Sequence, residues 1–160
     1  MTVLSAQSIR WLCSGDNIRY KPLISPFVER GIFKGKSYGL SACTYDCRIA
    51  QDIFLDRGIV VRASTMERFC FPDNICGSVL DKSTWARLGV SVFNTHFDPG
   101  FEGFATIELV NFGVMPTSIE EGSPICQFKF EWLDEPTELP YQGKYNNQES
   151  GPQAARYEQS

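Results

Sequence analysis

Hydrophobic and polar positions alternate cleanly between residues 101 and 110. One face of this stretch is small or apolar and consists of Phe101, Gly103, Ala105, Ile107 and Leu109. The other face consists of Glu102, Phe104, Thr106, Glu108 and Val110. Because successive side chains of a strand point to opposite sides, this alternation predicts a strand with one face in the core. Glu108 then lies on a strand otherwise built for burial, where a carboxylate without a partner is costly.

The remaining patterns predict one opening helix and many short strands. Residues 4–15 form the helix, with Ser5 as N-cap, Leu4 and Ile9 spaced as a hydrophobic staple, and Gly15 at the end. Residues 16–39 contain two prolines and three glycines, which predicts a loop with short extended pieces. The β-rich runs lie at residues 40–49, 57–63, 69–74, 75–80, 90–95, 117–121 and 124–132. Short strands with frequent turn signals predict an all-β barrel or jelly-roll.

A compact polar segment, residues 81–89, interrupts this β pattern. We expect a single short helix from Ser83 to Leu88, with Ser83 or Thr84 as N-cap and Gly89 just past the end. Ser83 and Arg87 are four residues apart and therefore share one helix face. A hydroxyl, a guanidinium and free amides on one side suit a phosphate or a bound water. The alternative is a solvated surface turn with Arg87 in an ordinary ion pair.

Length and composition set the broad class. The chain has 160 residues, a size typical of one domain with a real core, and we expect a single domain over residues 1–160. Its net charge of −4 argues against a nucleic-acid-binding surface. No run approaches the roughly 20 apolar residues of a membrane span, and the first residues lack a signal-peptide pattern. We therefore expect a cytoplasmic protein with no membrane partner.

The six cysteines predict neither a disulfide framework nor a zinc site. A chain of this size and apolar content does not need disulfides, so the cysteines are expected to be reduced. Zinc-dependent nucleobase deaminases need a His-x-Glu and a Pro-Cys-x-x-Cys, and this sequence has neither. The sequence therefore excludes the zinc-dependent class of nucleobase deaminase.

Four ordered motifs resemble those of the dCTP deaminase family, which belongs with the trimeric dUTPases. They are Lys82-Ser-Thr-Trp-Ala-Arg-Leu-Gly, Asp98-Pro-Gly-Phe-Glu-Gly, Ile107-Glu-Leu-Val-Asn and Tyr141-Gln-Gly-Lys-Tyr-Asn-Asn-Gln. The resemblance covers residues 67–156. It implies a dUTPase-like β-clip, a distorted jelly-roll barrel with a short N-terminal helix and one short active-site helix. It also implies zinc-independent hydrolysis of dCTP to dUTP and ammonia.

The resemblance implies a role for each residue of these motifs. Glu108 would act as base and then acid, with Ser83 holding the water and Arg87 orienting Glu108. The triphosphate would contact Lys82, Ser83, Thr84, Lys144 and Gln148, with Mg²⁺ bridging its oxygens and no protein side chain as metal ligand. Asp98 would accept a hydrogen bond from the sugar hydroxyl, Tyr141 would pack near the nucleotide, and Thr106 and Ile107 would line the site through their backbone.

The resemblance further implies a homotrimer with shared active sites, dTTP as an inhibitor and dUTP as a second nucleotide that could bind. By composition, residues 134–160 are a disordered tail, and by resemblance they are a lid that orders on binding. Each assigned residue has a structural alternative: Glu108 as a buried acid paired with Arg87, Asp98 as a turn residue, and Lys144 as a mobile tail residue.

Two departures from the family pattern leave the reaction open. Lys82 and Thr84 stand where the family usually has arginine and serine, and lysine lacks the bidentate fork. The stretch before Asp98 is shorter than the deaminase loop that reads the base, and Phe93-Asn94-Thr95 is similar to the uracil-reading hairpin of dUTPases. The alternatives are therefore a dUTP diphosphatase, a bifunctional enzyme that converts dCTP to dUMP, and a non-catalytic β-clip nucleotide-binding protein.

Overall fold

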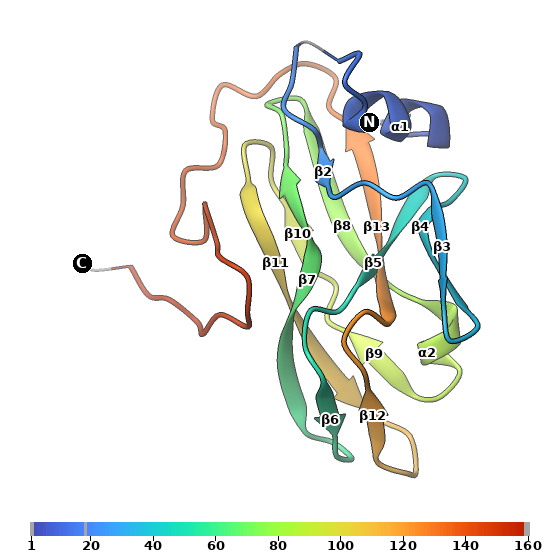
Figure 1. Cartoon of the computed structure of the whole chain (residues 1–160). Helices are drawn as coiled ribbons and strands as arrows, with labels where there is room; N and C mark the ends of the chain where they lie inside the picture. Colours follow the sequence, from blue (N-terminus) through green and yellow to red (C-terminus); the bar gives the residue numbers. More distant parts are fainter. Residues whose placement is uncertain (1, 18, 159–160) are drawn as a thin grey trace.

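The computed structural model describes residues 2–17 and 19–158 and confirms the all-β prediction (Figure 1). Its larger sheet has the spatial order β10-β8-β13-β5-β4-β3, with β1 added beside β13. Every pairing in it is antiparallel. The strands of this sheet are β1 (Thr2–Val3), β3 (Arg30–Phe33), β4 (Lys36–Leu40), β5 (Thr44–Arg48), β8 (Ile75–Asp81), β10 (His96–Phe97) and β13 (Pro124–Trp132).

The smaller sheet has the order β2-β7-β11-β9 and contains the two longest strands of the chain. Its members are β2 (Ile24–Ser25), β7 (Val60–Cys70), β9 (Val90–Val92) and β11 (Glu102–Asn111). A separate ribbon pairs β6 (Ile53–Leu55) with β12 (Thr117–Ile119). β7 and β11 run antiparallel, with a bulge between Phe104 and Thr106. A bulge bends its strand and re-aims the side chains that follow it.

One hydrophobic cluster joins the two sheets and the N-terminal helix. Its centre is aromatic: Phe69 of β7 stacks on Phe128 of β13 with ring centroids 4.3 Å apart. Helix α1 (Ala6–Cys13) covers one end through Ile9 and Leu12, both buried. Ser5 is its N-cap as predicted, but the Ser5 side chain makes no capping hydrogen bond. No helix in residues 2–17 and 19–158 is long and apolar enough to cross a bilayer.

The alternation of β11 is confirmed. Gly103, Ala105, Ile107 and Leu109 are buried, whereas the intervening residues from Glu102 to Glu108 are partly exposed. The prediction of two separate strands at 57–63 and 69–74 is wrong, because β7 runs unbroken between them. The polar residues in its middle are satisfied inside the fold: Glu67 pairs with Arg48 of β5 at 2.8 Å.

Helix α2 (Ser83–Ala86) is shorter than predicted, and its N-cap is Lys82 rather than Ser83 or Thr84. The Lys82 carbonyl accepts the first helical bonds, and no side chain caps the helix. Gly89 does follow the helical turn, with φ +83°. Trp85 fixes the element, because its indole is buried and its Nε1 donates to the Pro124 carbonyl at 2.7 Å.

The segment that follows β13 contains no helix or strand in its described part, residues 134–158, yet it is bound to the sheet. β9 pairs with β11 only from Leu109 to Asn111, so the other half of that β11 edge is open. The tail occupies this open edge: the Phe104 amide donates to the Gln148 carbonyl at 2.9 Å. Composition predicted disorder here because it does not record an unpaired strand edge that accepts the segment.

Candidate active site

A cavity of about 510 Å³ lies between the outer face of β7 and β11, the turn before β11, and the tail. Three parts of the chain build its wall. β7 and β11 contribute Arg62, Thr106 and Glu108. Residues 95–101, which include β10 and the turn after it, contribute Thr95, His96, Phe97, Asp98 and Phe101, and the tail contributes Tyr141, Tyr145, Gln148, Gln153, Ala154 and Ala155. The cavity therefore collects five of the residues singled out by sequence: Glu108, Asp98, Thr106, Tyr141 and Gln148.

Glu108 is half-buried in this wall, as the strand pattern indicates. Burial raises the pKa of its carboxyl above the ordinary value, while its own backbone amide and Arg62 act in the opposite direction. Within residues 2–17 and 19–158, no side-chain hydrogen bond or ion pair engages this carboxylate. A carboxylate that faces a cavity, with its pKa moved toward neutrality, can exchange a proton with water or a ligand.

Asp98 lies at the mouth of the cavity in the turn between β10 and β11. Its carboxylate is exposed and stands 3.5 Å from Nε2 of His96. The following Gly100 has φ +90°, and a Cβ there would lie 2.8 Å from the backbone nitrogen of Tyr141. This close approach needs glycine and brings the tail against the turn. Asp98 is therefore available to a ligand and is next to the tail.

Tyr141, Gln148 and Thr106 hold the tail over the cavity. The Tyr141 ring packs on Phe101 with centroids 6.2 Å apart, and its hydroxyl accepts a hydrogen bond from the Tyr145 amide. Gln148 Nε2 donates to Thr106 Oγ1 at 3.0 Å and to the Phe104 carbonyl at 2.8 Å. Gln148 is thus bonded to β11, and Thr106 meets the tail through its hydroxyl rather than its backbone.

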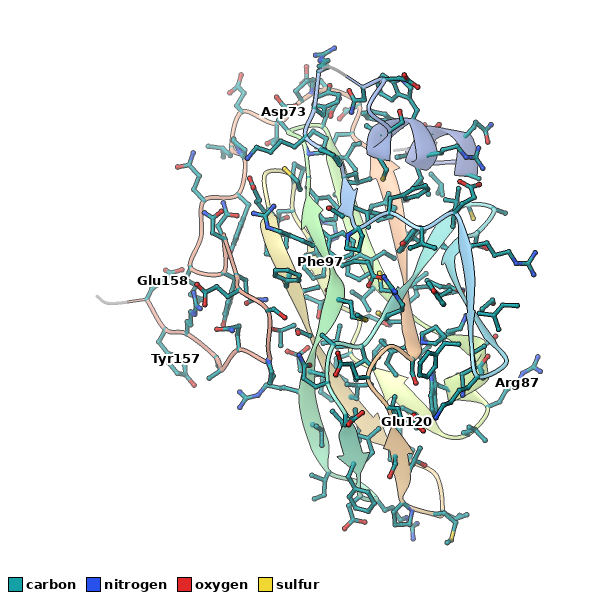
Figure 2. The ribbon with its side chains drawn as sticks, in the orientation of Figure 1. Asp73, Arg87, Phe97, Glu120, Tyr157 and Glu158 are labelled. Carbon is teal, nitrogen blue, oxygen red and sulfur yellow. The ribbon has the colours of Figure 1, made fainter. Side chains whose placement is uncertain are left out.

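Ser83, Thr84 and Arg87 do not reach this cavity within one chain. All three are exposed, Ser83 and Thr84 on α2 and Arg87 directly after it. Figure 2 shows Arg87 at the opposite edge of the molecule from Tyr157 and Glu158 of the tail, with Phe97 between them. Inside a single chain, neither the prediction that Arg87 orients Glu108 nor the alternative that the two residues form a buried pair is met.

Lys82 is buried, and its Nζ lies 2.5 Å from Oδ2 of Asp46. Gln127 Nε2 donates to the other oxygen of that carboxylate at 2.8 Å. The Lys82 ammonium, which was predicted to bind the triphosphate, is thus neutralised inside the fold by Asp46. The pair attaches the start of α2 to β5. A buried ion pair of this kind loses much stability if one partner is removed.

Ile107 and Lys144, the two other predicted residues, lie beside the cavity rather than in its wall. Ile107 is buried with its side chain on the core face of β11, so only its backbone can face a ligand. Lys144 Nζ lies 5.7 Å from the centre of the Tyr145 ring and 3.9 Å from a Glu158 oxygen. Its long side chain starts from the tail, within the segment that covers the cavity.

Sequence reasoning missed Arg62, the residue directly opposite Glu108 in the β7–β11 register. The signal in the sequence was a charged residue, Arg62, within a β-rich run. Glu108 is likewise a charged residue on a strand of mostly apolar residues. The relation of Arg62 to Glu108 depends on a pairing between residues 46 positions apart. No local pattern specifies such a register.

Comparison with known proteins places this geometry in a family. Residues 40–133 match the family model described as dCTP deaminase-like. The dCTP deaminase of Campylobacter curvus is 35% identical over 162 residues, covering 81% of this chain and 87% of that protein.

Solved structures agree on the fold. The 2′-deoxycytidine 5′-triphosphate deaminase of Agrobacterium tumefaciens superposes with a TM-score of 0.62 at 17% identity, covering 81% of this chain and 47% of that one. The EIAV dUTPase gives 0.53 at 18% identity, covering 76% and 98%. The curled sheets are thus those of the dUTPase-like fold, and the chain belongs to the dCTP deaminase-like family.

Proposed function

We propose that this protein catalyses the hydrolytic deamination of dCTP to dUTP and ammonia. The observation that carries the proposal is Glu108, a half-buried carboxyl of raised pKa that faces a cavity large enough for a nucleotide. The relative from Campylobacter curvus bears the name of this activity. A nucleotide pool enzyme works where its substrate is made, so we place the reaction in the cytoplasm.

Glu108 serves as base and then as acid. Its carboxylate takes a proton from a water, and the resulting hydroxide forms a bond to C4 of the cytosine. The proton passes from Glu108 to N3, which gives a tetrahedral C4 carrying both the hydroxyl and the amino group. The C4–N bond then breaks, the hydroxyl proton leaves with the nitrogen as ammonia, and the uracil carbonyl forms. One water is consumed and one ammonia is released per dCTP.

The active site is completed between subunits of a homotrimer. This part of the proposal is supported by the division of the predicted residues into two groups on one chain, the Glu108 cavity and exposed α2. Ser83 and Arg87 of one subunit would then approach the cavity of the next, where a guanidinium can orient a carboxylate and a hydroxyl can hold the water.

Mixing two inactive variants tests this sharing. Glu108→Gln lacks the base and Arg87→Ala lacks the guanidinium, so each homotrimer should be nearly inactive. After subunits are exchanged, mixed trimers contain some sites with both residues intact, and ammonia release should return to a fraction of the wild-type rate. Glu108→Gln mixed with Glu108→Gln/Arg87→Ala is the control and should stay inactive. No recovery in exchanged trimers would mean that both residues act from one chain.

The triphosphate carries Mg²⁺ into the site in this proposal. Mg²⁺ prefers oxygen ligands and usually binds through substrate phosphates with one or two carboxylates. In the described part of the chain no three His, Cys, Asp or Glu side chains gather as ligands. We therefore keep the triphosphate oxygens as the ligands of Mg²⁺, with no protein side chain among them, and Asp98 as the acceptor for the sugar hydroxyl. Lys144 on the tail and the α2 amides of a neighbouring subunit would meet the phosphates, and dTTP would compete for the same groups.

Asp98 favours one alternative, the hydrolysis of dUTP or the combined conversion of dCTP to dUMP. Its exposed carboxylate could activate a water at the α-phosphate, and the fold is shared with the EIAV dUTPase.

Product analysis separates the functions. The protein is incubated with dCTP and with dUTP in the presence of Mg²⁺, and ammonia, pyrophosphate and nucleotides are quantified. We expect the dCTP incubation to give ammonia and dUTP, and the dUTP incubation to give no product. Pyrophosphate from either nucleotide would support the alternative. If neither nucleotide gives a product, both reactions are excluded.

A further inference from the structure

Arg62 and Glu108 occupy opposite positions on adjacent strands and line the same cavity. Directly opposite residues of an antiparallel pair have Cβ atoms about 4.5–5.5 Å apart, so their side chains lie within reach of each other. Both point to the outer face of the β7–β11 pair, because the residues beside them, Ala63 and Ile107, are buried on the inner face. The backbone register therefore places a guanidinium beside the proposed base.

Arg62 is the only arginine or lysine in the cavity wall formed by the described residues. The next basic residue on the same face of β7 is Arg68, and Glu102 engages it at 2.8 Å. The other titratable groups that line the cavity with Glu108 are His96 of β10, Asp98 of the turn after it, and Tyr141 and Tyr145 of the tail. β9 contributes only Val90, Ser91 and Val92. Among the described residues that line the cavity, permanent positive charge thus comes from Arg62 alone.

We propose that Arg62 is a positioning residue for the deamination, which holds the Glu108 carboxylate toward the substrate and keeps it ionised for its first proton transfer. This inference rests on the proposed function. Burial alone favours the neutral acid, which cannot accept a proton from water. A guanidinium on the neighbouring strand favours the ionised form, in line with the direction in which Arg62 acts on the pKa of Glu108.

The same positive charge assists the second proton transfer. Once Glu108 has taken the proton from water it is neutral, and its attraction to Arg62 is weakened. Giving the proton to N3 restores the carboxylate and the attraction, so the cation makes protonated Glu108 a stronger acid. Burial and Arg62 therefore act in opposite directions, and their balance keeps the pKa of Glu108 in the range where one group can serve both steps.

Three variants test the proposal. Arg62→Met removes the charge while keeping an unbranched side chain, and Arg62→Lys keeps the charge. Arg57→Met is the matched control, because Arg57 is an exposed arginine outside the cavity wall and its loss changes the net charge equally. The pH dependence of kcat/KM for dCTP is measured for each, together with the titration of the Glu108 carboxyl by ¹³C NMR without substrate. Circular dichroism verifies that each variant is folded.

We expect Arg62→Met to move the acidic limb of the kcat/KM profile, and the NMR titration of Glu108, to higher pH. Arg62→Lys should restore most of the shift, and Arg57→Met should match the wild type. If Arg62→Met and Arg57→Met give the same titration of Glu108, the proposal is overturned. The NMR measurement needs no turnover, so a wild-type protein that releases no ammonia would reject the proposed function while the titration still decides whether Arg62 acts on Glu108.

Discussion

Gly103→Ala should release the tail from the cavity. Gly103 has φ +143°, and an added Cβ would lie 2.6 Å from the Gln148 nitrogen and 2.9 Å from its carbonyl oxygen. Both contacts are with backbone, so one of the two segments must move. Three of the hydrogen bonds between them connect the two neighbours of Gly103 to Asn147 and Gln148: Asn147 N to Glu102 O, Phe104 N to Gln148 O, and Gln148 Nε2 to Phe104 O.

These contacts set the size of the effect. At about 1 kcal/mol for each hydrogen bond, opening the tail costs the wild type roughly 3 kcal/mol. In the variant the clash prevents these bonds, so opening the tail no longer carries this cost. A difference of 1.4 kcal/mol is tenfold in an equilibrium constant, so the open population rises on the order of 100-fold. We expect faster proteolysis and amide exchange within residues 134–158, and a higher KM for dCTP because the cavity loses one wall.

Gly151→Ala is the matched control for backbone strain. Gly151 also lies in the tail with a positive φ, +101°, but a Cβ there meets no atom within 4 Å. It should therefore show only the cost of the unfavourable φ, about 1–3 kcal/mol, without a clash against β11. If Gly103→Ala exchanges its tail amides at the wild-type rate, the tail is not docked on β11 in solution, and the description of the cavity is wrong.

Two further predictions concern stability. Lys82→Met leaves the buried Asp46 carboxylate without its cation and should lower the free energy of unfolding by about 3–5 kcal/mol. Adding Asp46→Asn should recover much of the loss in urea unfolding at a fixed protein concentration, and an unchanged single variant would show that the pair is unimportant. Arg68 and then Lys21 lower the pKa of Glu102, so its contribution is present above the ordinary carboxyl pKa and is lost as pH falls through the lowered value. Arg68→Met should weaken the acid dependence of the unfolding free energy, and an identical slope would contradict this.

The sequence was sufficient for features that depend on local periodicity. The alternation of Gly103, Ala105, Ile107 and Leu109 predicted which face of β11 is buried, and with it the direction of Glu108. Gly89 was predicted to follow a helical turn because its backbone conformation is difficult for other residues. The all-β architecture followed from many short runs with frequent turn signals.

Features that depend on distant partners were not predictable in this way. The destination of the Lys82 side chain is decided by Asp46, on a strand that is remote in sequence. The neighbour of Glu108 is decided by the register between β7 and β11, which brings Arg62 rather than Arg87 beside it. The position of the tail is decided by the unpaired edge of β11, which composition does not record.

The most direct test of the central claim is a paired measurement on Glu108→Gln. Glutamine keeps the shape of the side chain but cannot accept the proton of water. We expect ammonia release from dCTP to fall by at least about 100-fold, while calorimetric titration gives a Kd for dCTP close to that of the wild type. A variant that still deaminates dCTP at the wild-type rate would contradict the account, because the cavity would then use a different base.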